Sequence, residues 1–335
     1  MEMTALETKQ KKILIAEDDP VSRRVLEAFL VKWGYQVTTA CNGEEALRVL
    51  ESDEAPRLAV LDWMMPEMEG VQVCAKIRST ANVRPYIYII LLTARTQRED
   101  LLAGMEAGID DYLTKPFDAQ ELRARLHVGQ RIVNLQDQLI GAREELRYRA
   151  THDALTGIYN RGEIIDALHR ERARQARDGG SFGVIIADLD HFKRVNDTYG
   201  HAAGDAVLRE ATVRMKASIR SYDFIGRYGG EEFLLVVPSS DAAGTFALAD
   251  RIRQSMQVSP VSTSAGEIPV TVSLGVAAST EICPLDAQNL LLRADEALYR
   301  AKENGRNRAE LFTPKDAAIS PQSSPQGDPV KSRTR

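Results

Sequence analysis

The chain has 335 residues, enough for two domains, and its 44% hydrophobic and 27% charged residues are ordinary for a globular protein. Its formal net charge of −5 argues against general nucleic-acid binding. Three widely spaced cysteines, Cys41, Cys74 and Cys283, fit no zinc or disulfide pattern and agree with a reducing cytosol. The chain begins without the apolar core of a signal peptide, and no apolar run approaches the roughly 20 residues that span a bilayer. We therefore expect a cytoplasmic protein with no membrane insertion.

The first part of the chain alternates predicted strands with predicted helices. Strands are expected over 12–16, 35–40, 58–62, 86–94 and near 110–115, and helices around 25–30 and over 43–51. This order predicts an α/β domain with a doubly wound parallel sheet, which we place at residues 11–128.

Polar residues stand where these strands end. Glu17, Asp18, Asp62, Thr93 and Lys115 all follow or close a predicted strand. Any one of them alone is better explained as a helix cap or turn residue. Ligands of parallel α/β sheets bind outside the carboxyl ends of the strands, however, and three carboxylates at one edge favour a hard divalent cation.

The motifs "ILIAEDDP", "LAVLDWMMPEMEG", "LLTA" and "DYLTKPF" together resemble a response-regulator receiver domain of flavodoxin-like fold. The resemblance implies that Asp62 accepts a phosphoryl group from a histidine kinase. It also implies one Mg²⁺, held by Glu17, Asp18, Asp62 and the backbone carbonyl of Met64. Thr93 and Lys115 would contact the phosphoryl oxygens, Lys115-Pro116 would be a cis peptide, and Tyr112 would reorient on activation.

A helical connector is expected over 129–150. Apolar residues recur at alternating spacings of four and three from Val128, through Ile132, Leu135, Leu139 and Ala142, to Leu146. This is the seam of a short coiled coil, and we favour a two-stranded stalk. The alternative is an amphipathic helix that packs on its own domain.

The remainder, 151–313, mixes helices with strands in the manner of an α+β domain. Helices are expected over 163–177, 205–219, 241–256 and 286–304, and strands over 183–190, 224–228, 233–237 and 269–278. The pattern predicts a largely antiparallel sheet with helices on one face. Residues 191–205 are polar and receive no predicted element, and the Pro- and Ser-rich tail, 314–335, is predicted to be disordered.

The segment "RYGGEEF" (227–233) places Gly229-Gly230 between two apolar runs, which indicates a hairpin. A charged hairpin tip is the simplest explanation of Glu231 and Glu232. If their strand neighbours that of Asp188, however, three carboxylates converge and require a cation. Lys193, Lys302 and Arg306 offer charges for phosphates, and the set as a whole indicates nucleoside triphosphate chemistry.

The motifs "DALTGIYNR", "DLDHFKRVNDTYGHAAGD", "RYGGEEF", "VTVSLGVA" and "ALYRAKENGRNR" resemble the GGDEF family of diguanylate cyclases. The resemblance implies that two GTP become cyclic di-GMP and two pyrophosphates, each domain of a homodimer holding one GTP. Two Mg²⁺ (with Mn²⁺ as an alternative ion) would be held by Asp188, the carbonyl of Leu189, Glu231 and Glu232, and Glu232 is also a candidate base. The implied substrate residues are Leu155, Phe192, Lys193, Asn196, His201, Asp205, Gly229, Gly230, Lys302 and Arg306.

The resemblance also implies an inhibitory product site at Arg220 and Asp223, with Arg251 contributing from a neighbouring helix. A charge pair at a helix end is the ordinary explanation of such an R-x-x-D spacing. Two other functions remain open: a catalytically inactive cyclic di-GMP sensor, and a scaffold that signals through protein contacts. A cyclase that also accepts ATP is a minor alternative, against which Asp205 favours guanine.

Overall fold

The structure is a computed structural model that describes residues 11–79, 85–94, 104–280 and 285–313. The chain folds as two compact units, 1–145 and 146–335, which are described separately. The expectations for Cys283 and for the tail lie outside the described residues.

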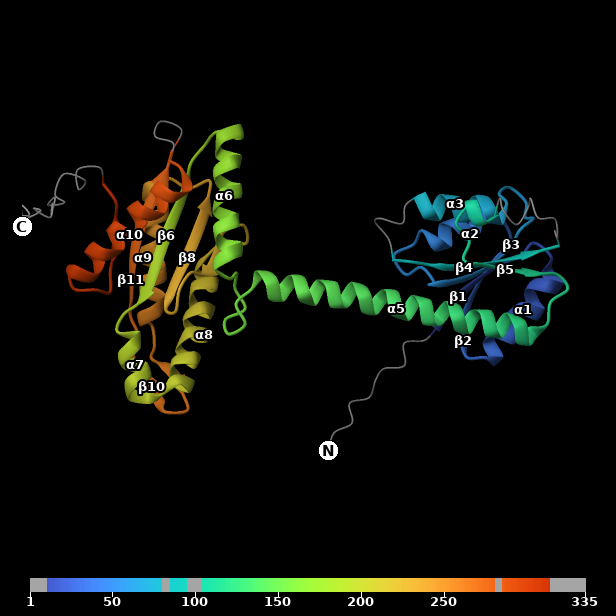
Figure 1. Cartoon of the computed structure of the whole chain (residues 1–335), viewed down its shortest axis with the longest axis horizontal. Helices are drawn as coiled ribbons and strands as arrows, with labels where there is room; N and C mark the ends of the chain where they lie inside the picture. The colour runs from blue at the N-terminus through green and yellow to red at the C-terminus, as the bar shows by residue number, and fades with distance from the viewer. Residues whose placement is uncertain (1–10, 80–84, 95–103, 281–284, 314–335) are drawn as a thin grey trace, which may run out of the picture. The chain divides into compact units, whose positions relative to one another are not determined.

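The first unit contains a five-stranded parallel sheet with helices on both faces (Figure 1). Its elements are β1 (Lys11–Ala16), α1 (Pro20–Lys32), β2 (Tyr35–Ala40), α2 (Gly43–Leu50), β3 (Leu58–Asp62), α3 (Gly70–Ser79), β4 (Tyr88–Thr93), β5 (Asp111–Thr114) and the start of α5 (Ala119–Thr151). The strand order β2-β1-β3-β4-β5 is that of flavodoxin-like doubly wound sheets, which confirms the predicted fold class.

Two apolar layers hold this sheet between its helices. One face packs against α2 and α3, around Leu14, Leu61 and Val73. The other packs against α1 and α5, around Leu30 and Leu126. The three central strands β1, β3 and β4 are buried on both faces along most of their length, and for this reason they appear in the sequence as continuous apolar runs instead of alternating ones.

The second unit has a five-stranded sheet in the order β12-β11-β6-β8-β7, antiparallel except for the β11–β12 pair. Its elements are α6 (Arg161–Asp178), β6 (Phe182–Leu189), α7 (Phe192–Tyr199), α8 (His201–Ser218), β7 (Phe224–Arg227), β8 (Glu232–Pro238), α9 (Ala242–Gln257), β9 (Val261–Thr263), β10 (Gly266–Ile268), β11 (Val272–Ser279), α10 (Ala287–Glu303) and β12 (Ala309–Leu311).

The prediction of helices on one face of this sheet is wrong. Successive residues of β6 enter different cores: Ile185 packs with α8 and α9, whereas Ile186 packs with α6 and α10. The sheet therefore has helices on both faces. Residues 191–205, which received no predicted element, form α7 and the start of α8.

Helix α5 has a buried face near its start and an exposed apolar stripe along its length. Leu122, Leu126, Gly129 and Val133 are buried against the first unit. Four residues of the predicted heptad seam, here called the outer stripe, stay exposed by 52–66%: Val128, Leu135, Leu139 and Leu146. Only the first part of α5, up to Val133, thus packs on the first unit, mainly through a face other than the predicted seam, and the rest of the predicted connector is largely exposed.

Candidate functional site

Three carboxylates gather at the carboxyl edge of the parallel sheet in the first unit. Glu17 follows β1 and Asp62 closes β3, and the parallel pairing of these strands brings their ends together. Ligand atoms of Glu17, Asp18 and Asp62 lie within 4.8 Å of one another, the only such group of three metal-binding side chains among the described residues. Carboxylate oxygens are the ligands Mg²⁺ prefers, so this donor set fits the implied ion.

Lys115 closes the same site from the end of β5. Its Nζ lies 2.7 Å from Glu17 Oε2 and 2.8 Å from Asp62 Oδ2. Burial would lower the pKa of Lys115, but these two carboxylates outweigh it and raise the pKa. Burial raises the pKa of Glu17, and Asp62 adds to the effect against the opposing Lys115. The site therefore brings a buried phosphoacceptor candidate beside a fixed cation.

The other predicted receiver residues lie at the same edge or beside it. Thr93 ends β4 fully buried, and its carbonyl accepts a 2.7 Å hydrogen bond from Lys115 N. The peptide Lys115-Pro116 is cis, as predicted. Met64 is exposed by 55%, and Tyr112 is partly buried against the core between the sheet, α2 and α3.

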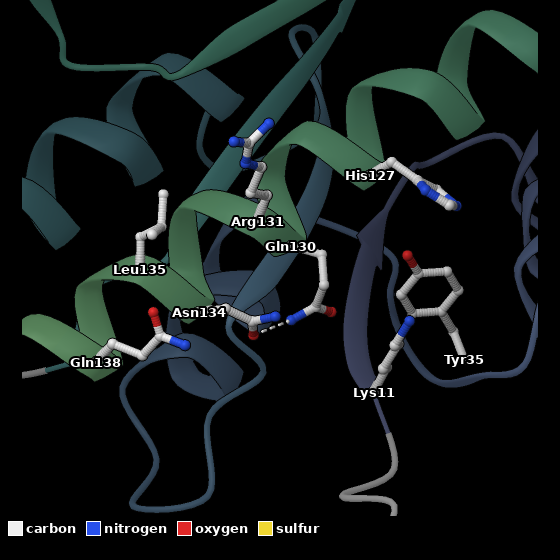
Figure 2. Close-up of a pocket in the computed structure, with 8 residues that line it drawn as sticks. All are labelled: Lys11, Tyr35, His127, Gln130, Arg131, Asn134, Leu135 and Gln138. Carbon is white, nitrogen blue, oxygen red and sulfur yellow. Dashed lines mark hydrogen bonds between the residues drawn. The ribbon is translucent and has the colours of Figure 1, made fainter. Parts of the chain in front are cut away.

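A depression of about 350 Å³ on the receiver unit lies elsewhere (Figure 2). Lys11 and Tyr35, the first residues of β1 and β2, form one side of it. The rest of the lining comes from α5: His127, Gln130, Arg131, Asn134, Leu135 and Gln138. First residues of parallel strands stand at the edge opposite to Asp62, so this depression is not part of the carboxylate site at Asp62.

In the second unit, the segment from Gly229 to Glu232 forms a hairpin turn that joins β7 to β8. Tyr228 N and Gly229 N both donate to the carbonyl of Glu232, at 2.8 and 3.2 Å. A Cβ on Gly229 would lie 2.3 Å from Glu232 Oε2, whereas one on Gly230 would meet nothing within 4 Å. Gly229 thus leaves room for the glutamate, and Gly230 leaves an open surface.

Of the three carboxylates predicted to converge at this turn, two form a cross-strand pair, and the three do not make a close group of the kind formed by Glu17, Asp18 and Asp62. Asp188 of β6 stands opposite Glu232 of β8, and Leu189 N donates to the carbonyl of Glu231 at 3.3 Å. Asp188 is only 7% exposed, and Lys302 Nζ from α10 lies 2.8 Å from its Oδ2. The charged hairpin tip is therefore part of a site built from two strands and a helix.

Burial and neighbouring negative charges raise the pKa values of two of these carboxylates, Asp188 and Glu231. Burial raises the pKa of Asp188, and neighbouring Asp190 adds to this while Lys302 and Arg306 oppose it. Burial also raises the pKa of Glu231, with further contributions from the charges of Asp188 and Glu232. Oxygen ligands under mutual repulsion fit a hard divalent cation, which would relieve it.

The predicted guanine-reading residues come from α7 and α8. A Cβ on Gly204 would lie 1.9 Å from Asn196 Oδ1, so the Asn196 side chain rests on the residue that precedes Asp205. Phe192 is buried, Lys193 and His201 are exposed, and Leu155 is partly buried against the core.

The predicted inhibitory residues lie beside a cavity of about 370 Å³. Its lining includes Arg220, Asp223, Lys216, His152 and Tyr159. Arg220 N donates to Asp223 Oδ2 at 2.8 Å, and the buried Asp223 Oδ1 has no hydrogen-bond partner among the described residues.

The third predicted inhibitory residue is engaged next to this motif. Arg251 on α9 donates through Nε and Nη2 to the carbonyl of Ser218, at 3.1 and 2.6 Å. Its guanidinium is therefore held at a residue that lies two positions before Arg220 in the sequence.

Two residues that shape this unit had no role in the sequence prediction. Arg227 donates to the carbonyl of Gly230 through Nε and Nη2, at 3.1 and 2.7 Å, and to both oxygens of Asp153 at 3.2 Å. Asp190 receives hydrogen bonds from three residues. Asp190 stands beside a recognised strand end, which is a detectable signal, whereas Arg227 looks like any charge at the end of a strand.

Comparison with known families defines the class of protein. Residues 13–127 match the response regulator receiver domain, and residues 150–308 match the family described as diguanylate cyclase, GGDEF domain. No described helix is long and apolar enough to cross a membrane. The chain belongs to the response regulators that join a receiver domain to a GGDEF diguanylate cyclase domain.

Particular relatives support this assignment. The chain is 32% identical to the response regulator PleD of Caulobacter vibrioides over 75% of its own length and 55% of PleD. It is 36% identical to the diguanylate cyclase DgcP of Pseudomonas aeruginosa over 63% of its own length and 32% of DgcP. It thus spans about half, or less, of these relatives.

A solved structure that contains a GGDEF domain also matches this chain. It is the coiled coil and GGDEF domain of DgcB from Caulobacter crescentus in complex with c-di-GMP, with a TM-score of 0.51 and 32% identity. The match covers 57% of this chain and 98% of that one.

Proposed function

We propose that this chain converts two GTP into cyclic di-GMP and two pyrophosphates, under the control of phosphorylation at Asp62. The observation that carries the proposal is the pairing of Asp188 with Glu232 across β6 and β8, beside the open Gly230 and with Lys302 2.8 Å from Asp188. A cytoplasmic location follows from the proposed substrate, because GTP is available there.

In the proposed reaction, the 3′-oxygen of one GTP attacks the α-phosphorus of the other. The bond from the α-phosphorus to the bridging oxygen breaks, pyrophosphate leaves with the electron pair, and the hydroxyl proton passes to a base for which Glu232 is the candidate. Two such steps close the ring.

The residues of this chain would bind and orient the nucleotide. Asp188, the carbonyl of Leu189, Glu231 and Glu232 would hold Mg²⁺, which when bound neutralises phosphate charge and acidifies the attacking hydroxyl. Lys193, Lys302 and Arg306 would face the phosphates, and Asn196 and Asp205 would read the guanine edge. A carboxylate at Asp205 suits the N1–H and N2–H₂ donors of guanine better than adenine.

Each domain would hold one GTP, so the reaction requires two copies of the chain. The outer stripe supports a homodimer, because its four exposed apolar residues lie at heptad spacing on a helix of 33 residues. Orienting two bound reactants lowers a barrier by about 7–11 kcal/mol in favourable cases.

Receiver control and product inhibition complete the proposal. A cognate histidine kinase would phosphorylate Asp62, and the added charge would bias a conformational equilibrium. Cyclic di-GMP would inhibit by binding Arg220, Asp223 and Arg251. Two observations support this interpretation: Asp223 Oδ1 finds no hydrogen-bond partner in the part of the chain that the structure describes, and Arg220 and Asp223 line a cavity of about 370 Å³.

The test uses purified full-length chain with GTP and Mg²⁺, with and without acetyl phosphate, and follows nucleotides by chromatography. We expect cyclic di-GMP that increases with acetyl phosphate in the wild type but not in Asp62→Ala. Glu232→Gln should reduce product by about 100-fold or more, the usual contribution of a general base. Its matched control is Glu267→Gln, at an exposed acid on β10.

Absence of product under every condition would contradict the enzyme proposal. Binding of cyclic di-GMP that depends on Arg220 and Asp223 would then favour the sensor function instead.

A further inference from the structure

Asp190 occupies a buried position between the metal-binding strand and the phosphate-facing loop. It directly follows β6, two residues after Asp188, and only 7% of its surface is exposed. A buried carboxylate requires hydrogen-bond donors around it. Thr271 Oγ1 and Ser273 Oγ donate to it at 2.6 and 2.7 Å, and Asn307 N donates at 3.0 Å.

These donors come from two separate parts of the unit. Thr271 and Ser273 belong to the neighbouring strand β11 and the residues before it. Asn307 belongs to the loop that follows α10, and its backbone N–H is fixed in direction once the loop conformation is set. Asp190 therefore ties this loop to the end of the sheet.

The loop that Asp190 holds, residues 305–307, has an energetically unfavourable backbone conformation. Gly305, Arg306 and Asn307 have φ values of 108°, 59° and 49°, three consecutive left-handed residues of which two are not glycine. A non-glycine residue there costs about 1–2 kcal/mol, so surrounding contacts must maintain it. One such contact is the Arg306 N–H, which donates to the carbonyl of Ala301 at 2.9 Å, and the Asp190–Asn307 bond is the next along the loop.

Arg306 is the residue whose direction this conformation decides. Its side chain is exposed, and it follows by four residues Lys302, whose Nζ lies 2.8 Å from Asp188 Oδ2. The loop therefore begins next to the candidate metal and triphosphate site, and its conformation sets the direction in which Arg306 leaves the backbone.

We propose that Asp190 is a positioning residue for GTP binding, which acts by holding Asn307 N–H and thereby aiming Arg306 at the triphosphate. This inference rests on the proposed function and adds a residue that touches neither metal nor nucleotide. Asp190→Ala should raise KM for GTP by roughly 10-fold, the usual effect of losing a hydrogen bond to a charged group, with a smaller change in kcat.

The decisive measurement is a double-mutant cycle of Asp190→Ala with Arg306→Ala in the full chain, read as KM and kcat for GTP. If Asp190 acts through Arg306, removing Asp190 changes KM little once Arg306 is gone. An equal increase of KM in both backgrounds would overturn the proposal, because it would reveal a merely structural effect.

Two further variants separate positioning from folding. Asp190→Asn can still present an oxygen to Asn307 N–H and should keep KM within about 3-fold of wild type. Ser273→Ala removes a donor to the same carboxylate but leaves the loop contact, and it should leave KM unchanged. An increase in KM for Ser273→Ala equal to that for Asp190→Ala would contradict the proposed route through Asn307.

If Asp190→Ala does not fold, Asp190→Ser takes its place in the double-mutant cycle. The serine side chain is one atom too short to reach the positions of the aspartate carboxylate oxygens. Turnover of GTP by the wild type separates the failure of this inference from the failure of the proposed function. No turnover in the wild type refutes the proposed function alone, and binding of a non-hydrolysable GTP analogue then measures the same cycle without catalysis.

Discussion

Arg227 connects two turns that lie far apart in the sequence. It bridges the carboxylate of Asp153, 74 residues earlier in the chain, and the carbonyl of Gly230 in the hairpin. Asp153 also accepts from Thr156 N and Oγ1, at 2.9 and 2.6 Å. The turn that opens the cyclase domain and the glycine turn are therefore held by one ion pair.

The charge of Asp153 should make part of the domain's stability pH-dependent. Burial would raise the pKa of Asp153, but the Thr156 hydrogen bonds and Arg227 outweigh it and lower the pKa. A lowered folded pKa means that the stabilisation is complete above the unfolded value, about 3.9, and is lost as pH falls through the folded value. Asp153→Asn should thus lower the free energy of unfolding on the order of 1 kcal/mol at pH 7, and by less as pH approaches 3.

Urea unfolding at pH 7, 5 and 3 measures this difference. The matched control is Asp178→Asn, which removes an exposed ion pair with Arg177 and should change stability little at any pH. A deficit in Asp153→Asn that is the same at all three pH values would contradict the linkage.

At the level of single residues, the strand pattern placed Asp62, Asp188 and Glu232 at or beside strand ends, and the structure confirms these positions. That Asp188 and Glu232 stand opposite each other depends on the pairing of β6 with β8, which the sequence left open. The Asp190–Asn307 contact joins residues 117 apart, and no local spacing encodes a contact of that kind. The residues that support the site were therefore harder to predict than those that form it.

Among the elements, α5 contains two glycines in contrasting surroundings. A Cβ on Gly129 would lie 2.4 Å from the ring of Tyr88, which is 3% exposed, whereas one on Gly141 would meet nothing within 4 Å. Close packing of α5 on β4 therefore depends on the first glycine and is independent of the second.

The two positions give a matched pair of substitutions. Gly129→Ala should destabilise the receiver domain by about 1–2 kcal/mol, because overpacking outweighs the gain of about 1 kcal/mol in helix propensity. Gly141→Ala gains the same helix propensity, and its Cβ meets no neighbouring atom, so this substitution should stabilise the helix. Thermal unfolding of the two variants checks this, and equal effects of the two substitutions would refute the contact with Tyr88.

The exposed outer stripe of α5 predicts that the chain associates with a second copy through this helix. Leu139 is 65% exposed, and Leu139→Glu should weaken self-association by about 10-fold or more, because a charge would enter an apolar seam. Asn134→Asp adds the same charge at an exposed polar position of α5 and should leave association unchanged. Sedimentation across a concentration series would measure both, and a monomeric wild type would refute the stalk.

The prediction of elements succeeded where caps and apolar periods were both present. Helices α2, α6, α9 and α10 were expected, and each begins with an Asn or Asp whose side chain accepts a backbone N–H. Helices α7 and α8 are preceded by the N-cap residues His191 and Gly200, neither of which makes a side-chain cap bond, and for this reason α7 and the start of α8 were missed. The short strands β9, β10 and β12, three residues each, carry too little pattern to be recognised.

On the scale of the whole molecule, the receiver site and the outer stripe belong to adjacent parts of the chain. Lys115 contacts Asp62, and α5 begins at Ala119, four residues later. The helix continues to Thr151, across the boundary at residues 145 and 146 between the two compact units. A change at the edge of the sheet that holds Asp62 therefore has only a short path to the helix that would form the dimer.

The uninterrupted helix has a further consequence in angular terms. Each residue added to an α-helix rotates the downstream part of the chain by about 100°, so an insertion after Gly141 resets the rotational phase of the cyclase domain. An insertion of seven residues returns the downstream helix to within about 20° of its original rotation. An insertion of four residues shifts the heptad repeat out of register.

Cyclic di-GMP production by such insertion variants should accordingly recover at seven residues and fall between one and six, and acetyl phosphate should stimulate only the variants in phase. If cyclic di-GMP production did not depend on the length of the insert, the helix would act only as a flexible connection between the two domains. A seven-residue period would mean that evolution can retune this regulator by changing the length of α5 while leaving both of its sites untouched.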